Sequence, residues 1–251
     1  VADDSSNDAE VCVGYELKDN SGRIVSSSSR SVSIKAGEVQ VVELSDTIPD
    51  VLHWSAEKPN LYKLFITLSQ GGKTLETIPF HVGFRRFEMK GNLFLVNGKC
   101  VKFKGVNIHE HNEKTGHYVT DEIRREDFRI MKANNINAVR LCHYPQDRRF
   151  YEMCDEIGLY VYDEANIESH GMGYNLTKGR TLGNNPDWLE VHMERTRNMF
   201  ARNKNYPCVT IWSLGNEAGN GYNFYNTYLY LKNEEKELMN RPVNYERALL
   251  E

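Results

Sequence analysis

The chain has 251 residues, 26% of them charged and 40% hydrophobic, and a formal net charge of −4. This balance is typical of a globular protein with a sizeable core, and the lack of basic runs argues against nucleic-acid and anionic-membrane partners. Neutral partners therefore fit best. No apolar run approaches the roughly 20 residues of a membrane span. The five cysteines lie mostly in apolar patterns, which favours small buried side chains over a disulfide framework or a metal cluster.

The first third of the chain has a β pattern. Residues 1–10 are polar and acidic and are expected to form a disordered tail. Strands are predicted over 11–17, 30–34, 39–44, 63–68 and 74–82, with a hairpin turn at Gly71-Gly72. Regular strand spacing without a helical period predicts an immunoglobulin-like β-sandwich over residues 11–90.

The rest of the chain alternates between strands and helices. A hairpin around Asn97-Gly98 marks the junction, with strands expected at 94–96 and 101–103. Further strands are predicted at 102–106, 138–142, 159–162, 209–214 and 243–245, and helices at 122–134, at 148–157, from Asp187 to just before Pro207, and around Phe224–Leu231. Residues 91–251 therefore predict the first part, about five strands, of a TIM (β/α)8 barrel, or an open parallel sheet.

Polar residues that suit chemistry follow successive predicted strands, which favours the barrel. They are His109 and His111, then His143, then Glu164, Asn166, Glu168 and His170, and finally Asn216 and Glu217. A barrel gathers such strand exits onto one face. A nucleotide-binding sheet is disfavoured because no glycine-rich phosphate loop follows the first strand.

Glu217 is the first candidate for a catalytic carboxyl. The buried strand 209–214 stops abruptly at Gly-Asn-Glu, the position where α/β folds place their active sites. A carboxylate that caps the following helix is an equally good explanation. Asn216 beside it suits hydrogen bonding to a hydroxylated ligand, although asparagine is also a common turn residue.

A metal site is the second candidate. Glu168 and His170 share one side of an extended segment, and with Glu217 they could bind Mg²⁺ or Mn²⁺. A surface Glu–His pair is the alternative. For His109 and His111 the alternative is a buried, hydrogen-bonded histidine.

Asp163-Glu164 and Trp212 also have competing interpretations. The two acidic residues could be partners of Arg140, partners of metal ligands, or satisfied charges at a strand end. Trp212 is expected in the core and not in a sugar platform.

Four segments together resemble glycoside hydrolase family 2, most of all its large bacterial β-galactosidases of the lactose-cleaving type. They are Gly105-Val106-Asn107-Ile108-His109-Glu110-His111; Asn137-Ala138-Val139-Arg140 with His143-Tyr144-Pro145; Asp163 to Met172 (DEANIESHGM); and Ile211 to Glu217 (IWSLGNE). His53-Trp54-Ser55, Pro59 to Tyr62 and Val82 to Arg86 resemble the immunoglobulin-like domain that precedes the barrel in that family.

The resemblance implies hydrolysis, with retention, of terminal β-D-galactose from β-galactosides such as lactose. It implies that Glu217 is the acid/base and that Glu168, His170 and Glu217 hold a magnesium ion. It further implies that His109 and His143 contact the galactosyl group and that Asn216 bonds the sugar 2-hydroxyl.

The resemblance also implies what the chain lacks. The family's nucleophile is a glutamate on the seventh barrel strand, so an internal fragment that is inactive alone is expected. An open barrel edge would favour self-association or pairing with the remaining polypeptide. Alternatives are a β-glucuronidase or β-mannosidase, a non-catalytic carbohydrate-binding or assembly fragment, and a histidine-based metallohydrolase. A bacterial cytoplasm and a periplasm both remain open.

Overall fold

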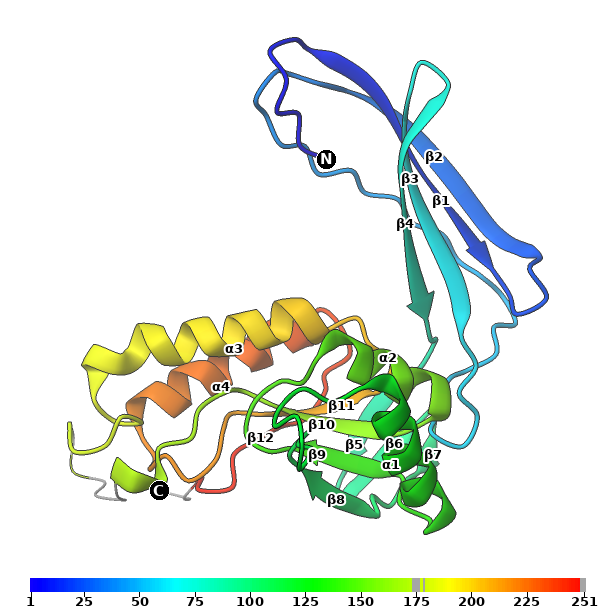
Figure 1. The fold of residues 1–251 in the computed structure, drawn as a ribbon. Coiled ribbons are helices and arrows are strands. Elements are labelled where there is room, and N and C mark those ends of the chain that lie inside the picture. Colours follow the sequence, from blue (N-terminus) through cyan, green and yellow to red (C-terminus); the bar gives the residue numbers. More distant parts are fainter. Residues whose placement is uncertain (173–176, 178, 249–251) are drawn as a thin grey trace. The chain divides into compact units, whose positions relative to one another are not determined.

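The computed structural model describes residues 1–172, 177 and 179–248 and divides the chain into two compact units (Figure 1). One unit comprises Val1–Leu52 and Asn60–Phe84, and the other His53–Pro59 and Arg85–Glu251. Residues 53–59 and 85–90 of the predicted sandwich range thus belong to the second unit. For residues 53–59 the reason is Trp54, which is fully buried and donates its indole N–H to the carbonyl of Asp155 at 2.9 Å.

The first unit contains a four-stranded antiparallel sheet, as expected for this region. Its strands are β1 (Ala9–Lys18), β2 (Ile24–Ile34), β3 (Tyr62–Gln70) and β4 (Lys73–Val82), in the order β2-β1-β3-β4. The strand predicted at 39–44 is wrong, because among the described residues this segment makes a single bridge, Ala2 to Val39. Its alternation is nevertheless real: Val42 and Leu44 face a cavity of about 370 Å³ against β1 and β3, while Val41 is exposed. The segment therefore covers the sheet without pairing as a strand.

Residues 1–10 are not a free tail. The Asp3 N–H donates to the Glu38 carbonyl at 3.0 Å, the Gln40 N–H donates to the Val1 carbonyl at 2.8 Å, and β1 already begins at Ala9. Polar composition misled the prediction, because these backbone bonds do not depend on the side chains.

A three-stranded meander opens the second unit: β5 (Phe87–Lys90), β6 (Leu93–Val96) and β7 (Lys99–Cys100). The predicted turn is confirmed, since Asn97 and Gly98 both have positive φ, 51° and 77°. The strand expected at 101–103 is wrong. A two-residue turn brings the residues directly after Gly98 into register, so Lys99 pairs with Val96.

A five-stranded, fully parallel sheet follows, in the order β12-β11-β10-β9-β8. Its strands are β8 (Gly105–Ile108), β9 (Ala138–Leu141), β10 (Tyr160–Glu164), β11 (Val209–Ser213) and β12 (Val243–Asn244). The first strand begins three residues later than predicted, at Gly105, which pairs with Ala138. A Cβ at Gly105 would lie 3.3 Å from the Ala138 carbonyl oxygen, so glycine suits this close pairing.

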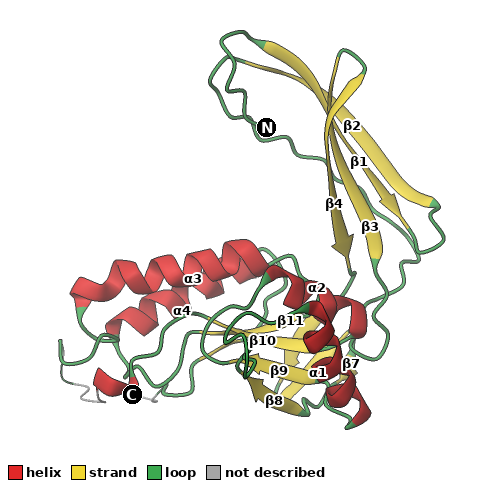
Figure 2. Cartoon of the chain, viewed as in Figure 1, coloured by secondary structure: helices red, strands yellow, loops and turns green. Residues whose placement is uncertain are grey.

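Helices connect the parallel strands (Figure 2). They are α1 (Asp121–Ala133), α2 (Arg148–Ile157), α3 (Leu189–Asn203) and α4 (Tyr222–Lys236), with short 3₁₀ turns η1 (His170–Met172) and η2 (Pro186–Trp188). Asp187 does not cap the third helix as predicted. Asn185 caps η2 by accepting from the Asp187 N–H, and α3 follows this turn. No helix in the described part of the chain is both long and apolar enough to cross a bilayer.

The core of the second unit lies around β10 and β11, which have no exposed residue. Trp212 on β11 is fully buried, which confirms its assignment to the core. Its indole N–H donates to Glu235 at 2.8 Å, and the Arg241 guanidinium lies 4.7 Å from its ring centroid. Arg241 and Glu235 are themselves fully buried and form an ion pair at 2.6 Å that holds the end of α4 to the segment entering β12.

Candidate active site

The polar residues singled out in the sequence lie at the end of β10 or after β8, β9, β10 and β11, whose carboxyl ends meet at one edge of the parallel sheet. The segments that follow β10 and β11 remain in contact beyond the strands: the Asn216 N–H donates to the Ile167 carbonyl at 2.8 Å, and Glu168 bridges Asn216 in parallel register. Gly215 permits this approach, because a Cβ there would lie 2.4 Å from the Ile167 oxygen. Both segments are thus fixed against each other.

Glu217 follows directly, in a left-handed backbone conformation with φ of 37°. For a residue other than glycine this conformation is uncommon and costs about 1 kcal/mol or more. The Glu217 carboxylate contacts His170 Nδ1 and lies 3.6 Å from Arg247, while its N–H donates to Glu246 at 2.9 Å. The helix-cap explanation is wrong, since α4 begins at Tyr222 and its N-cap is Gly221.

Glu168 joins the same group. Its Oε1 accepts from the His170 N–H at 2.7 Å and its Oε2 accepts from the Asn216 amide at 2.6 Å. The three residues predicted as magnesium ligands and Asn216 therefore form one connected set, with His170 turned toward Glu217. Two carboxylates and one imidazole make an oxygen-rich donor set that fits a hard divalent cation.

Behind this set lies Glu164, a fully buried carboxylate at the end of β10. It accepts hydrogen bonds from Arg140 Nε at 2.8 Å and from the Ser213 hydroxyl at 2.6 Å, and it lies 2.6 Å from His143 Nδ1. Arg140 also donates to the Asn216 oxygen at 2.9 Å. The pairing of Glu164 with Arg140, one of the interpretations left open in the sequence, is confirmed.

Asp163, its neighbour, has a different role. It accepts from the Tyr151 hydroxyl and from Asn203, each at 2.7 Å, and burial raises its pKa to about 6. It is a satisfied charge within the core of the second unit. Successive side chains of a strand point to opposite faces, which separates the two acids.

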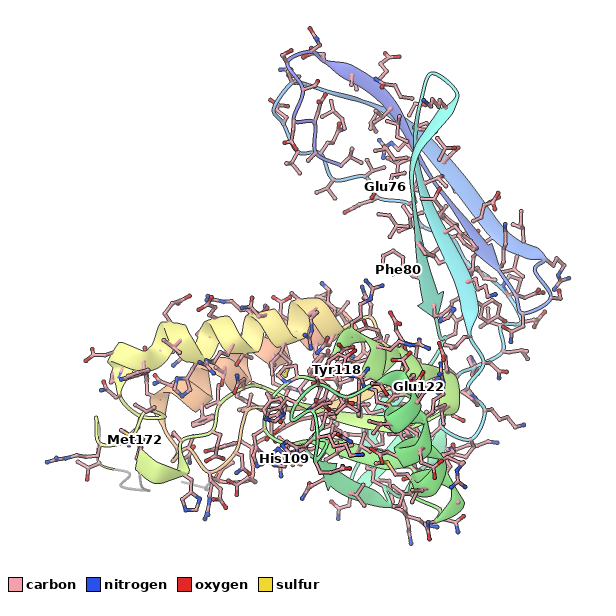
Figure 3. All side chains as sticks on the ribbon, viewed as in Figure 1. Glu76, Phe80, His109, Tyr118, Glu122 and Met172 are labelled. Carbon is pink, nitrogen blue, oxygen red and sulfur yellow. The ribbon has the colours of Figure 1, made fainter. Side chains whose placement is uncertain are left out.

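His109, labelled in Figure 3, lies after β8. Its ring centroid lies 5.3 Å from that of His143. Desolvation by neighbouring atoms and the imidazoles of His143 and His117 lower its pKa. His109 and His111 are both exposed, and the buried-histidine explanation is therefore wrong for each of them. His111 packs edge-on against His117 instead, at 5.3 Å between centroids.

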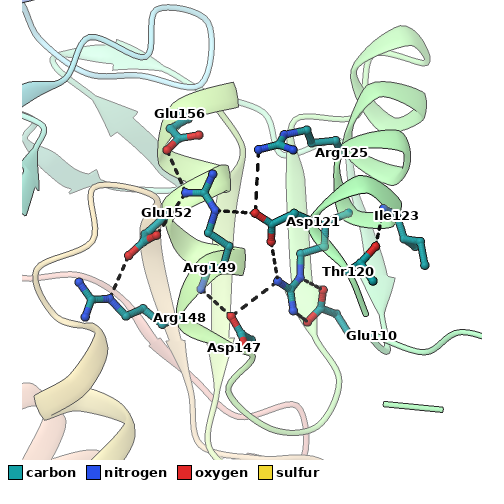
Figure 4. A network of polar contacts seen from close by, with 11 residues as sticks. Glu110, Thr120, Asp121, Ile123, Arg125, Asp147, Arg148, Arg149, Glu152 and Glu156 are labelled. Carbon is teal, nitrogen blue, oxygen red and sulfur yellow. Dashed lines mark hydrogen bonds and ion pairs between the residues drawn. The ribbon is translucent and has the colours of Figure 1, made fainter. Parts of the chain in front are cut away.

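One supporting pair was missed in the sequence. Glu110 and Arg124 are both buried and form a bidentate contact, with Nε–Oε1 at 2.5 Å and Nη2–Oε2 at 3.1 Å. Arg124 also reaches Asp121 and Asp147, within the network drawn in Figure 4. This contact fixes the segment next to His109 onto α1. Its partners lie 14 residues apart with no motif to link them, so the sequence carries no direct signal for it.

Comparison with known proteins agrees with the fold. Residues 1–85 match the family model "Glycosyl hydrolases family 2", and residues 87–250 match the TIM barrel domain of that family. The β-galactosidase of Halalkalibacterium halodurans is 42% identical and aligns over 96% of this chain and 24% of its own length. That of Streptococcus thermophilus is 45% identical, over 77% of this chain and 19% of its own. The chain thus spans about a quarter or less of these curated relatives.

Solved structures give the same fold. A β-glycosidase from Bacteroides vulgatus matches with a TM-score of 0.72 at 27% identity, covering 94% of this chain and 29% of its own. A β-glucuronidase from Bacteroides uniformis matches with a TM-score of 0.78 at 23% identity, over 97% and 30%. At that identity the second match shows a shared fold alone. With both family models matched along nearly the whole chain, this chain belongs to glycosyl hydrolase family 2.

Proposed function

We propose that this chain carries the acid/base half of the active site of a retaining β-galactosidase, which releases terminal β-D-galactose from β-galactosides such as lactose. The observation that carries the proposal is the connected set at the ends of β10 and β11, in which Glu217 contacts His170 and Asn216 bonds Glu168. The relatives named β-galactosidase, at 42–45% identity, support galactose as the sugar.

Glu217 is the proposed proton donor and acceptor. As an acid it would protonate the glycosidic oxygen, and as a carboxylate it would then take a proton from the attacking water. Its φ of 37° and the bond from its N–H to Glu246 fix where the carboxyl can reach. Because the Glu217 carboxyl is already fixed in the free protein, it loses little conformational freedom when the transition state forms.

Asn216, His109 and His143 are the proposed sugar contacts. The bonds of Asn216 to Arg140 and Glu168 use one of the two lone pairs and one of the two N–H donors of its amide, and they fix which way the amide points. Glu164 holds the His143 ring through Nδ1, so that Nε2 is the atom directed to a ligand. Neutral imidazoles can bond hydroxyl groups as donors or acceptors.

We further propose that Glu168, His170 and Glu217 hold Mg²⁺, with Mn²⁺ as a substitute. Bound there, the cation would supply positive charge that stabilises the carboxylate form of Glu217. The cation would also relieve the repulsion between the two carboxylates.

Turnover needs a second carboxyl about 5–5.5 Å from the first. We propose that further polypeptide supplies it and that this chain alone is inactive. β8 and β12 are the outer strands of the sheet and could each accept another strand. The same sheet borders a largely apolar cavity of about 320 Å³, lined in part by Phe103, Val106 and Tyr160, which added strands or a second copy of the chain could cover.

The test is hydrolysis of an aryl β-D-galactoside with Mg²⁺, by this chain alone and with a separately expressed downstream polypeptide. We expect no turnover alone, turnover on mixing, and loss of that turnover in Glu217→Gln. Activity of the chain alone that survives Glu217→Gln would refute the assignment of Glu217. Aryl β-D-glucuronide and β-D-mannoside serve as matched substrates, and faster cleavage of either one would refute galactose specificity.

A further inference from the structure

A second cluster of metal-ligating side chains lies beside the proposed magnesium ligands and is made of other residues. His109, Cys142 and His143 each offer one donor atom, and the three atoms all lie within 4.8 Å of one another. The cluster is graded in exposure, from the exposed His109 through the half-buried His143 to the buried Cys142. An ion could thus enter from the His109 side and reach the sulfur.

The imidazole of His143 has the partner expected of a metal ligand. Its Nδ1 lies 2.6 Å from the fully buried carboxylate of Glu164, so its Nε2 is the atom left to coordinate. Metal-bound histidines almost always bond a carboxylate or carbonyl through the other ring nitrogen, which fixes the ring and raises its basicity. Glu164 is itself fixed by Arg140 and Ser213, which makes this orientation rigid.

The three donor atoms of the cluster determine which metal ion it favours. One thiolate and two imidazoles are borderline-soft ligands, which favour zinc and other late first-row ions over Mg²⁺. Three protein ligands leave a fourth position of a tetrahedral ion open to water or another ligand.

We propose that His109, Cys142 and His143 form a Zn²⁺ site distinct from the proposed magnesium ligands Glu168, His170 and Glu217. Because His109 and His143 are also the proposed sugar contacts, Zn²⁺ and the galactosyl group would exclude each other at this site. Binding converts the Cys142 thiol to a thiolate, forms the Zn–S bond and releases the thiol proton to solvent. The sequence pattern had assigned the cysteines to the core, and Cys142 is indeed buried. Its two histidine neighbours are what give it a further role.

The experiment is a Zn²⁺ titration of this chain at pH 7 with excess Mg²⁺, repeated with Co²⁺ as a spectroscopic probe. Excess Mg²⁺ is added to fill the proposed magnesium ligands, and a near-ultraviolet thiolate-to-cobalt charge-transfer band reports on sulfur coordination alone. We expect one Zn²⁺ per chain and a Co²⁺ band. In Cys142→Ser the band should vanish and Zn²⁺ binding should weaken by at least about tenfold, the lower end of what loss of a supporting partner costs.

Two further variants complete the test. Cys100→Ser removes an exposed thiol elsewhere and should change neither readout. His109→Gln alters an exposed side chain, so we expect the fold to stay intact and Zn²⁺ binding to weaken by at least about tenfold. A Co²⁺ band absent from the unmodified chain, or Zn²⁺ affinity unchanged in Cys142→Ser or His109→Gln, would overturn the proposal.

Discussion

The antiparallel sheet of the first unit and the parallel sheet of the second differ in what their strands bury. β10 and β11 have no exposed residue, whereas every residue of β4 from Lys73 to His81 is exposed, including Glu76 and Phe80 in Figure 3. On an exposed strand a polar residue carries no cost in burial free energy, so its presence does not indicate a functional role. On a strand buried on both faces an acid must be satisfied or functional, so Asp163 and Glu164 carry information that Glu76 does not.

The largest expected effect comes from the buried ion pair of the parallel sheet. Arg241→Met leaves Glu235 buried without its cation, and we expect the free energy of unfolding of the second unit to fall by about 3–5 kcal/mol. Urea unfolding followed by tryptophan fluorescence measures this, because Trp212 contacts both residues. The double variant Glu235→Leu/Arg241→Met should be less destabilised than the single one. If Arg241→Met is neutral, the pair does not hold the end of the sheet.

A matched pair of leucines compares the two sheets directly. Leu141 on β9 is fully buried, while Leu75 on β4 is 53% exposed. We expect Leu141→Ala to cost about 2–5 kcal/mol and Leu75→Ala less than about 0.5 kcal/mol, each measured by urea unfolding. Equal costs would contradict the contrast in burial between the two sheets.

The next prediction concerns pH and a buried acid on α2. Burial raises the pKa of Asp155 to about 7, although its carboxylate accepts the Cys208 N–H at 2.7 Å. Because the folded pKa exceeds the unfolded value of about 4, the folded state holds the extra proton between these values. Its contribution to stability is complete below pH 4 and is lost as the pH rises to 7, a change on the order of a few kcal/mol.

Asp155→Asn should therefore flatten the fall in unfolding free energy between pH 4 and 7. A smaller slope of the same sign should remain from Asp163, whose pKa is raised to about 6. Urea midpoints of both proteins at several pH values provide the measurement. An unchanged slope in the variant would show that Asp155 titrates normally.

The smallest effect concerns the site itself. Ser213→Ala removes one hydrogen-bond donor to Glu164, which keeps its contacts with Arg140 and His143. We therefore expect the free energy of unfolding to fall by about 1 kcal/mol. Ser28 on β2 is exposed and serves as the control, with an expected change within about 0.5 kcal/mol. Equal values for the two serines would mean that the Glu164 network adds nothing to stability.

Sequence reasoning succeeded where local pattern decides the outcome. The alternation of strands and helices from β8 onward follows from hydrophobic periodicity, and the parallel sheet is confirmed. Boundaries failed where a neighbour decides them: β8 begins where Ala138 pairs with Gly105, and residues 1–10 are ordered by the backbone of 38–40. Residues 39–44 alternate as a strand does, yet only tertiary pairing could have made them one.

The sequence by itself determined which residue types follow each parallel strand, because chain order and strand period are local properties. It thereby placed His109, His143, Glu168, His170, Asn216 and Glu217 at one edge of the sheet. Only the tertiary structure decided which of them touch, since Glu217 meets His170 across 47 residues and Arg140 meets Asn216 across 76. It alone distinguished Glu164 from Asp163 and brought Cys142 together with two histidines, because burial and contacts between distant segments arise only when the chain folds.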